Sequence, residues 1–214
     1  MGRHARQVFC KGKHIFLEFE GDLFLHNHLL MRGRWRLSKG RLLFVPEGCW
    51  LALCVGRHTI CNQNGQMLRH ESSAEVAAAL ASLGPDVMAE PYPAAEIASA
   101  LRGSDQPIGP TLLDQSRVCG MGNIAKSEAL YLAQIDPRTP ARDLREPAVR
   151  RLVEAMREVC RASYHKGGRW TCEVYQRGGQ ECRQCGEKIA RIVQAGRSTY
   201  FCPTCQDQSP LFGG

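Results

Sequence analysis

The first third of the chain shows the short alternation of apolar and polar residues that is typical of β-strands. The alternation is clearest over residues 14–19, 23–26 and 41–45. Turn-forming sequences, Glu-Gly-Asp at 20–22 and Ser-Lys-Gly at 38–40, separate these segments. The pattern therefore predicts an antiparallel, β-rich module.

Beyond residue 71 the apolar spacing changes to that of helices. Ser-Ser-Ala-Glu at 72–75 has N-terminal capping chemistry and opens an apolar run, which Leu-Gly-Pro-Asp at 83–86 closes. The Pro- and Gly-rich stretch that follows is the best place for a domain junction. Further helices are predicted over 94–101 and 145–164, and between them a helix that residues 120–124 open and Asp136-Pro137 ends. Short strands are predicted over 173–175 and 198–201.

Length and composition restrict the class of protein. With 214 residues, 43% hydrophobic and 23% charged, the chain can form one large or two small globular domains, and it is neither a fibre nor a disordered tail. The longest apolar-rich stretch, 74–83, is far shorter than the roughly 20 residues that span a bilayer. The basic start lacks the apolar segment of a signal peptide, so we expect a reducing, cytoplasmic location.

Four of the 11 cysteines form two C-x2-C pairs. The first pair is Cys182 and Cys185, and the second is Cys202 and Cys205, with sixteen residues between Cys185 and Cys202. This spacing suits a closed, tetrahedral zinc site. The sequence predicts one structural Zn2+ that holds a β-hairpin, and does not activate water. The unpaired cysteines are interpreted as small buried hydrophobes: Cys10, Cys49, Cys54, Cys61, Cys119, Cys160 and Cys172.

Three segments have the chemistry to contact a polyanion, which the net charge of +7 favours. Arg197 follows a glycine near the tip of the predicted zinc hairpin, and Asn123 follows two glycines at a helix start, as a cap or as a donor. Met31 and Arg32 lie among arginines, where an apolar wedge can replace an everted base while cations hold the backbone. Taken singly, each also fits a plainer role: a solvated arginine, a tight turn with an Asn cap, or a core methionine.

In this order the motifs resemble the formamidopyrimidine-DNA glycosylase and endonuclease VIII family of base-excision enzymes. The resemblance runs from about Arg6 to Gln206. Residues 12–19 resemble the family's lysine-bearing strand, residues 28–33 its methionine segment, and residues 113–130 its helix–two-turns–helix. The resemblance implies Lys13 near the phosphates and the scissile sugar, and Met31 in the base stack. It also implies Asn123 clamping a phosphate, and Arg197 gripping a phosphate and assisting strand cleavage.

The resemblance fails at the start of the chain. The family's N-terminal proline, whose amine attacks the sugar, and the glutamate after it have no counterpart in Met1-Gly2-Arg3-His4. Position 109, often a phosphate-contacting lysine, is glycine, and the insertion that caps 8-oxoguanine is absent, which favours oxidised pyrimidines or abasic sites. Three explanations are open: a binding protein that lost its chemistry, an enzyme with another nucleophile, or a missing first segment. The α-amine of Gly2 is partly neutral at neutral pH, because α-amines titrate at about 8, whereas Lys13 needs a strongly lowered pKa.

We therefore expect an α+β protein: a reduced antiparallel β-sandwich module, a helix–two-turns–helix domain and a C-terminal zinc-finger β-hairpin. The expected divisions are residues 1–86, 87–171 and 172–214. The predicted function is repair of damaged or abasic DNA as a glycosylase and abasic-site lyase, with Lys13, Arg197 and Gly2 as catalytic candidates. The alternatives are a damage- or structure-specific DNA-binding protein without activity and a zinc-held protein-interaction domain. The chain is expected to be a bacterial-like, nucleoid-associated monomer.

Overall fold

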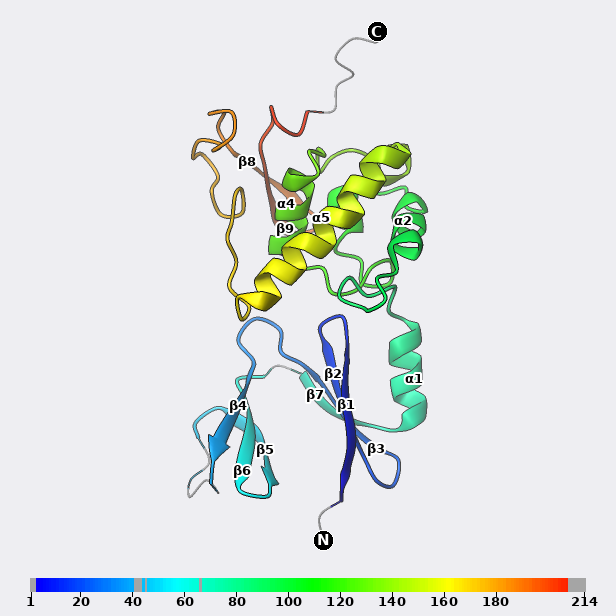
Figure 1. Ribbon diagram of the computed structural model, residues 1–214, viewed down its shortest axis with the longest axis vertical. Coiled ribbons are helices and arrows are strands. Elements are labelled where there is room, and N and C mark those ends of the chain that lie inside the picture. Colours follow the sequence, from blue (N-terminus) through cyan, green and yellow to red (C-terminus); the bar gives the residue numbers. More distant parts are fainter. Residues whose placement is uncertain (1–2, 41–43, 45, 66, 208–214) are drawn as a thin grey trace. The chain divides into compact units, whose positions relative to one another are not determined.

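The computed structural model describes residues 3–40, 44, 46–65 and 67–207. The chain forms two compact units, Met1–Ala81 and Ser82–Gly214. Figure 1 shows strands and one helix in unit 1, and helices with a β-hairpin in unit 2. The three-part division at residues 86 and 171 stays a prediction. None of the helices in the described part of the chain combines the length and the apolar composition that crossing a membrane requires.

Unit 1 contains two antiparallel sheets, as the alternating pattern predicts. The predicted strands at 14–19 and 23–26 are both present, whereas of residues 41–45 only Phe44 is described. The four-stranded sheet has the order β1 (Ala5–Lys11), β2 (His14–Phe19), β3 (Leu23–His28), β7 (Met67–Glu71), and the three-stranded sheet the order β4 (Arg34–Lys39), β6 (His58–Gln63), β5 (Cys49–Val55).

A small core and one buried amide hold unit 1 together. Phe16, Phe24 and Val76 form the core under helix α1 (Ser73–Ala81). The capping box at the start of α1 is formed as predicted: the Ser72 N–H donates to the Glu75 carboxylate at 2.8 Å, and the Glu75 N–H donates to the Ser72 hydroxyl. The two sheets are joined where the fully buried Asn27 accepts hydrogen bonds from Trp35 and Asn62.

Unit 2 has the larger core, built around a pair of packed helices, α4 (Asn123–Leu132) and α5 (Glu146–His165). Helix α4 ends at Leu132, before the predicted stop at Asp136-Pro137, because Gln134 adopts a left-handed φ of 57° and the Ile135 N–H bonds back to the Leu130 carbonyl. The helices of the unit are α2 (Ala94–Arg102), α3 (Ile108–Thr111), α4 (Asn123–Leu132), the 3-10 helix η1 (Ala141–Asp143) and α5 (Glu146–His165).

The chain ends in the hairpin of β8 (Ala190–Gln194) and β9 (Arg197–Phe201). Its two turn residues, Ala195 and Gly196, have φ values of 46° and 71°, the left-handed conformation that two-residue hairpin turns need. The strand predicted at 173–175 is wrong. These residues form bends and turns because their backbone N–H groups donate to the Glu128 carboxylate and not to a neighbouring strand.

Candidate nucleic-acid interface

The four paired cysteines come together at the base of the β8–β9 hairpin. Their sulfur atoms all lie within 4.8 Å of one another, with Cys182 and Cys205 3.8 Å apart and Cys185 and Cys202 3.4 Å apart. Sulfurs bound to one zinc at about 2.3 Å in a tetrahedron are about 3.8 Å apart, so the spacing fits zinc. The Tyr131 hydroxyl lies 3.3 Å from the Cys182 sulfur and can donate to it as a thiolate.

The hairpin presents Arg197 next to the start of helix α4. Arg197 is the exposed first residue of β9. The Asn123 amide donates to the Ser198 carbonyl at 2.8 Å, while its side-chain oxygen is buried and has no hydrogen-bond partner among the described residues. Gly122, and not Asn123, occupies the N-cap position, so the amide acts as a donor between α4 and β9. A second amide hydrogen of Asn123 remains for a ligand.

A buried lysine forms the next link between α4 and β9. Lys126 has a relative exposure of 0%, and its ammonium donates to the Thr199 hydroxyl at 2.7 Å. It makes no ion pair with any residue in the described part of the chain. Burial, with a smaller contribution from Arg197, lowers the pKa of Lys126 to about 8. At neutral pH the buried Lys126 ammonium therefore carries a positive charge beneath the face that carries Arg197, and this burial lowers the stability of the folded protein.

We expect the Lys126→Met variant to be more stable than the wild-type protein, by about 2 kcal/mol at neutral pH. The pKa is lower in the folded than in the unfolded chain, so the penalty is complete below about pH 8 and is relieved as the pH rises toward the usual lysine value of 10.5. Urea unfolding of both proteins against pH measures this difference. It should shrink above about pH 8, and the exposed Lys188→Met control should show no such trend.

Helix α4 also fixes the segment that leads to the zinc site. Glu128 is 5% exposed, and its carboxylate accepts hydrogen bonds from the backbone N–H groups of Glu173, Val174 and Tyr175 at 2.8, 3.1 and 2.8 Å. Three N–H groups converging on one carboxylate form a compact anion-binding turn. The helix start, the hairpin and the segment before the first cysteine pair are thereby joined into one framework.

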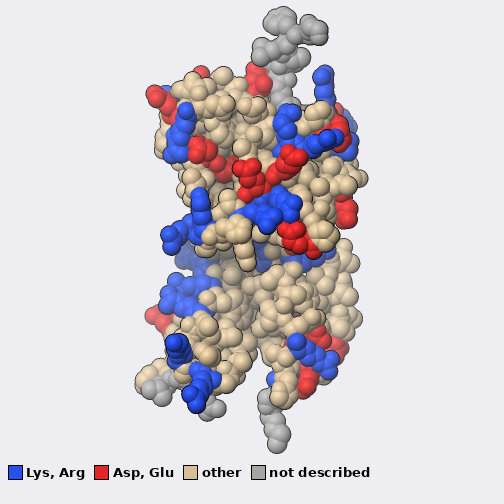
Figure 2. Space-filling view, in the orientation of Figure 1, with Lys and Arg blue, Asp and Glu red and all other residues tan. Residues whose placement is uncertain are grey.

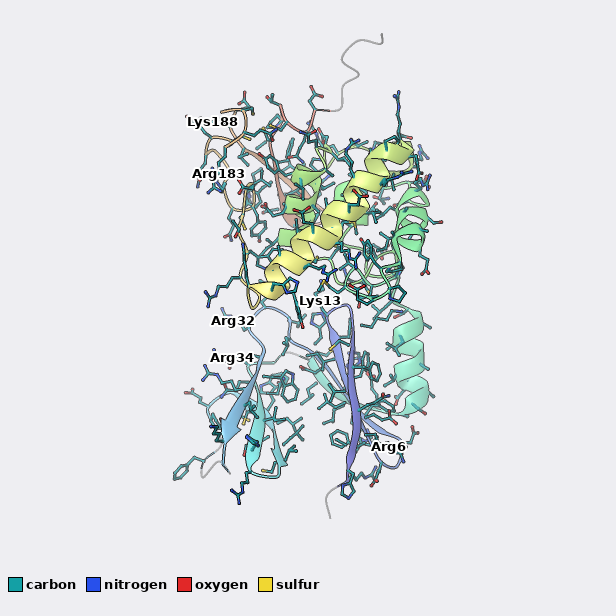
Figure 3. All side chains as sticks on the ribbon, viewed as in Figure 1. Arg6, Lys13, Arg32, Arg34, Arg183 and Lys188 are labelled. Atoms are coloured by element: carbon teal, nitrogen blue, oxygen red, sulfur yellow. The ribbon has the colours of Figure 1, made fainter. Side chains whose placement is uncertain are left out.

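In unit 1, the other predicted contact residues lie at one end of the four-stranded sheet. Lys13 is exposed in the β1–β2 turn, and Arg32 is exposed in the loop before β4; Figure 3 shows both at the same end of the unit. Met31 stands at the tip of this loop with 84% of its surface exposed, so the plainer interpretation as a core residue is wrong. A Cβ atom at Gly33 would lie 2.5 Å from the Leu29 carbonyl oxygen, so glycine is needed to close the loop.

Charge is distributed unevenly over the surface shown in Figure 2. Lys and Arg side chains predominate along the β4 side of unit 1, whereas acidic and basic groups alternate over helix α5 in unit 2. Arg34 on β4 is labelled in Figure 3 near Arg32. The exposed arginines of the loop and of β4 thus form the most uniformly basic part of this view.

Position 109 is constrained by the hairpin. A Cβ atom there would lie 2.3 Å from the Gln194 side-chain oxygen, and the Gln194 amide donates to the Pro137 carbonyl at 3.0 Å. A larger residue at Gly109 would therefore have to displace Gln194.

The structure brings Asn123 and Arg197 to adjacent positions in unit 2, and Lys13, Met31 and Arg32 to one end of unit 1. Gly2 lies outside the described residues. The sequence analysis missed Lys126 and Glu128, which follow Asn123 on α4. Both side chains are buried on α4, and helical spacing does not mark them, because residues two apart point to different sides of a helix.

Comparisons with known proteins cover almost the whole chain. The family model "Formamidopyrimidine-DNA glycosylase H2TH domain" matches residues 83–173, and "Zinc finger found in FPG and IleRS" matches 179–208. The chain is 34% identical to a formamidopyrimidine-DNA glycosylase of Thermus thermophilus over 98% of its own length and 85% of the relative. It is 34% identical to one of Chloroflexus aurantiacus, over 96% and 81%.

Two solved structures with similar folds contain DNA. A structure of MutM in complex with DNA that contains carbocyclic 8-oxo-G matches with a TM-score of 0.83 and 28% identity, over 97% of this chain and 83% of that one. A complex of the Lactococcus lactis Fpg with abasic-site DNA matches with a TM-score of 0.82 and 27% identity, over the same shares.

Proposed function

The chain belongs to the formamidopyrimidine-DNA glycosylase and endonuclease VIII family, and from this membership we propose that it is a DNA glycosylase and abasic-site lyase of base excision repair. Its partner is damaged or abasic DNA. Its cofactor is one structural zinc ion, bound by Cys182, Cys185, Cys202 and Cys205. The ion holds the hairpin in place and takes no part in bond cleavage, because four protein ligands leave no open coordination position.

The observation that carries the proposal is the junction of α4 with the zinc hairpin. Arg197 on the hairpin and Asn123 on α4 are held in adjacent positions through the Ser198 carbonyl, and the Lys126 charge lies beneath them. A guanidinium and an amide on rigid elements suit the oxygens of a backbone phosphate. A glycosylase needs such a grip because everting a base costs several kcal/mol in lost stacking and pairing.

Replacing Arg197 by alanine should weaken DNA binding and reduce its salt dependence. Each cation that neutralises a phosphate releases counterions, so the slope of log K against log salt should fall by about one in the variant. Asn123→Ala removes a neutral donor, and should weaken binding without changing the slope. Fluorescence anisotropy with a labelled duplex at several salt concentrations measures both effects.

The matched control is Arg183→Ala. Arg183 is exposed on the same zinc finger, but its guanidinium pairs with Glu173 at 3.0 Å. Its removal should leave the slope close to that of the wild-type protein. If the two variants had equal slopes of log K against log salt, Arg197 would not contact a phosphate.

Unit 1 would contact the strand that carries the lesion. Met31, exposed at the tip of a glycine-closed loop, would fill the space of the everted base, and Arg32 would hold the adjacent backbone. Lys13 is the candidate on the described chain for the amine that attacks the sugar C1′ atom. The α-amine of Gly2 is the second candidate. Arg197 would stabilise the phosphate that departs when the strand is cleaved.

Strand incision tests the proposed function and its lesion preference. End-labelled duplexes that contain an abasic site, an oxidised pyrimidine or 8-oxoguanine are incubated with the protein and resolved on denaturing gels. We expect cleavage at the abasic site and at the oxidised pyrimidine, and weaker cleavage at 8-oxoguanine. Only eight residues separate α5 from Val174, which leaves no room for the insertion that caps 8-oxoguanine in the family. If the protein binds these duplexes but cleaves none of them, it is a damage-binding protein without glycosylase or lyase activity.

We further propose that the protein works as a monomer on chromosomal DNA in the bacterial cytoplasm, associated with the nucleoid. The support for this location is the proposed function itself, because chromosomal DNA is the substrate.

A further inference from the structure

Three histidines and a glutamate line one face of the four-stranded sheet in unit 1. His14 begins β2, and His26 and His28 lie on β3. Glu71 ends β7, the strand that pairs with β3. The register sets His14 opposite His28, and His26 opposite Phe16, so all of these side chains share the face that contains the core of the unit.

Three of these residues form a continuous chain of hydrogen bonds. The His14 Nδ1 and His26 Nε2 atoms are 2.8 Å apart, and the His26 Nδ1 atom lies 3.0 Å from both oxygens of Glu71. His26 is 4% exposed and Glu71 8% exposed. We call Glu71, His26 and His14 the relay. It leads from a buried carboxylate to a half-buried imidazole.

The hydrogen bonds allow this relay two states that differ by one proton. The Glu71 carboxylate accepts, so the His26 Nδ1 atom carries a hydrogen. If His26 is neutral, its Nε2 atom accepts from His14, and the outer His14 Nε2 atom is an acceptor. If His26 is protonated, its Nε2 atom donates to His14, and the outer nitrogen of His14 is a donor. One added proton therefore changes the group that the relay presents at its outer end.

The groups around His14 disfavour a proton on that residue. Burial, together with His28, His26 and Lys13, lowers the pKa of His14 to about 4, so His14 remains neutral. If His26 takes up the proton, it forms an ion pair with Glu71, whose carboxylate lies 3.0 Å from its Nδ1 atom. The Leu30 N–H donates to His28 Nδ1 at 3.0 Å, which fixes His28 as a neutral donor at Nε2. The other charged groups on this face are Lys11, across from His14, and the exposed Arg69, across from His26.

The outer end of the relay lies where unit 1 is proposed to meet DNA. His14 directly follows Lys13, and the wedge loop with Met31 and Arg32 begins after His28. A phosphate accepts hydrogen bonds and donates none, so it selects the relay state in which the outer nitrogen of His14 is a donor. That state carries the additional proton on His26.

We propose that the relay of Glu71, His26 and His14 is a proton-coupled phosphate-binding site, which takes up one proton when DNA binds beside Lys13. This inference rests on the proposed binding to DNA and is independent of catalysis. By linkage, the pH that loads the relay also raises the affinity for DNA, to the same degree that DNA promotes proton uptake. No bond is made or broken besides those to the proton, which comes from the solvent and is held between His26 and Glu71.

Titration calorimetry tests the proposal on the full chain. A duplex with a tetrahydrofuran abasic analogue, which an amine cannot cleave, is bound at one pH in buffers of different ionisation enthalpy. The slope of the observed enthalpy against ionisation enthalpy gives the number of protons taken up. We expect a positive slope for the wild-type protein and none for Glu71→Gln, whose affinity should fall about fivefold or more below neutral pH.

Two further variants keep the result unambiguous. Glu75→Gln changes an exposed acid on α1, outside the relay, and should keep the wild-type slope. His14→Gln interrupts the relay at its half-buried end, where folding is least affected, and should lose the slope even if Glu71→Gln is unstable. A slope of zero in the wild-type protein, or an unchanged slope in His14→Gln, would overturn the proposal.

A measurement without DNA separates this inference from the proposed function. Long-range ¹H–¹⁵N spectra of the imidazoles should show the nitrogens of His14 and His26 changing together over one titration, while His28 keeps its hydrogen on Nε2. Independent titrations of His14 and His26 would contradict the relay whatever the protein does to DNA. Proton uptake on binding, with no strand incision, would support the relay and refute the lyase function.

Discussion

Replacing Cys202 by serine is expected to abolish both zinc binding and tight binding to damaged DNA. Three thiolates leave the tetrahedral site incomplete, and zinc binding is worth about 10 kcal/mol or more to folding in small zinc-held modules. Without zinc the hairpin loses the position that places Arg197 next to Asn123. Two lost phosphate contacts, at about 1.5–3 kcal/mol each for hydrogen bonds with charged groups, predict a complex weaker by about a hundredfold or more.

The measurement is zinc content by metal-release assay, followed by binding to an abasic duplex. Cys172→Ser is the matched control, because Cys172 is a partly buried thiol next to the finger but outside the cluster. It should retain one zinc per chain and the wild-type affinity. Tight binding by a zinc-free Cys202 variant would refute the structural role of the ion.

The second large effect is expected from Glu128→Ala. The substitution leaves three backbone N–H groups of residues 173–175 without the carboxylate that accepts from them. Each unsatisfied buried donor costs about 1–3 kcal/mol. Because only the hydrogen bond of the Val174 N–H is fully buried, we expect the lower part of the summed range, a loss of about 3–5 kcal/mol in the free energy of unfolding. Urea unfolding monitored by circular dichroism measures the loss.

Two variants control this experiment. Glu128→Gln keeps one accepting oxygen and should be less destabilised than the alanine variant. Glu158→Ala removes an exposed acid from the neighbouring helix α5 and should change the stability by less than about 0.5 kcal/mol. A Glu128→Ala protein as stable as the Glu158 control would mean that water replaces the carboxylate at no cost.

The sequence predicts well those features that depend on local spacing. Two C-x2-C pairs define the zinc site, the capping box of Ser72 and Glu75 marks the start of α1, and the Ala195-Gly196 turn closes the hairpin. Each of these is determined by residues that lie close together in the chain.

The features that the sequence does not reveal depend on contacts over long sequence distances. Residues 173–175 have the apolar pattern of a strand, but Glu128, 45 residues away from Glu173, takes their N–H groups. The relay joins His26 to Glu71, also 45 residues apart, and Lys126 meets Thr199 across 73. Periodicity cannot report such pairs, because it describes which face a residue occupies and not what lies opposite.

Covalent trapping is the most direct test of the central claim that the protein cleaves abasic DNA through an amine. The protein is incubated with an abasic duplex and sodium borohydride, which reduces the imine between the amine and the sugar C1′ atom to a stable bond. We predict a one-to-one protein–DNA adduct, and peptide mass spectrometry should locate it at Lys13 or at the N-terminal amine. The absence of any adduct, together with intact DNA in the unreduced reaction, would contradict the lyase function.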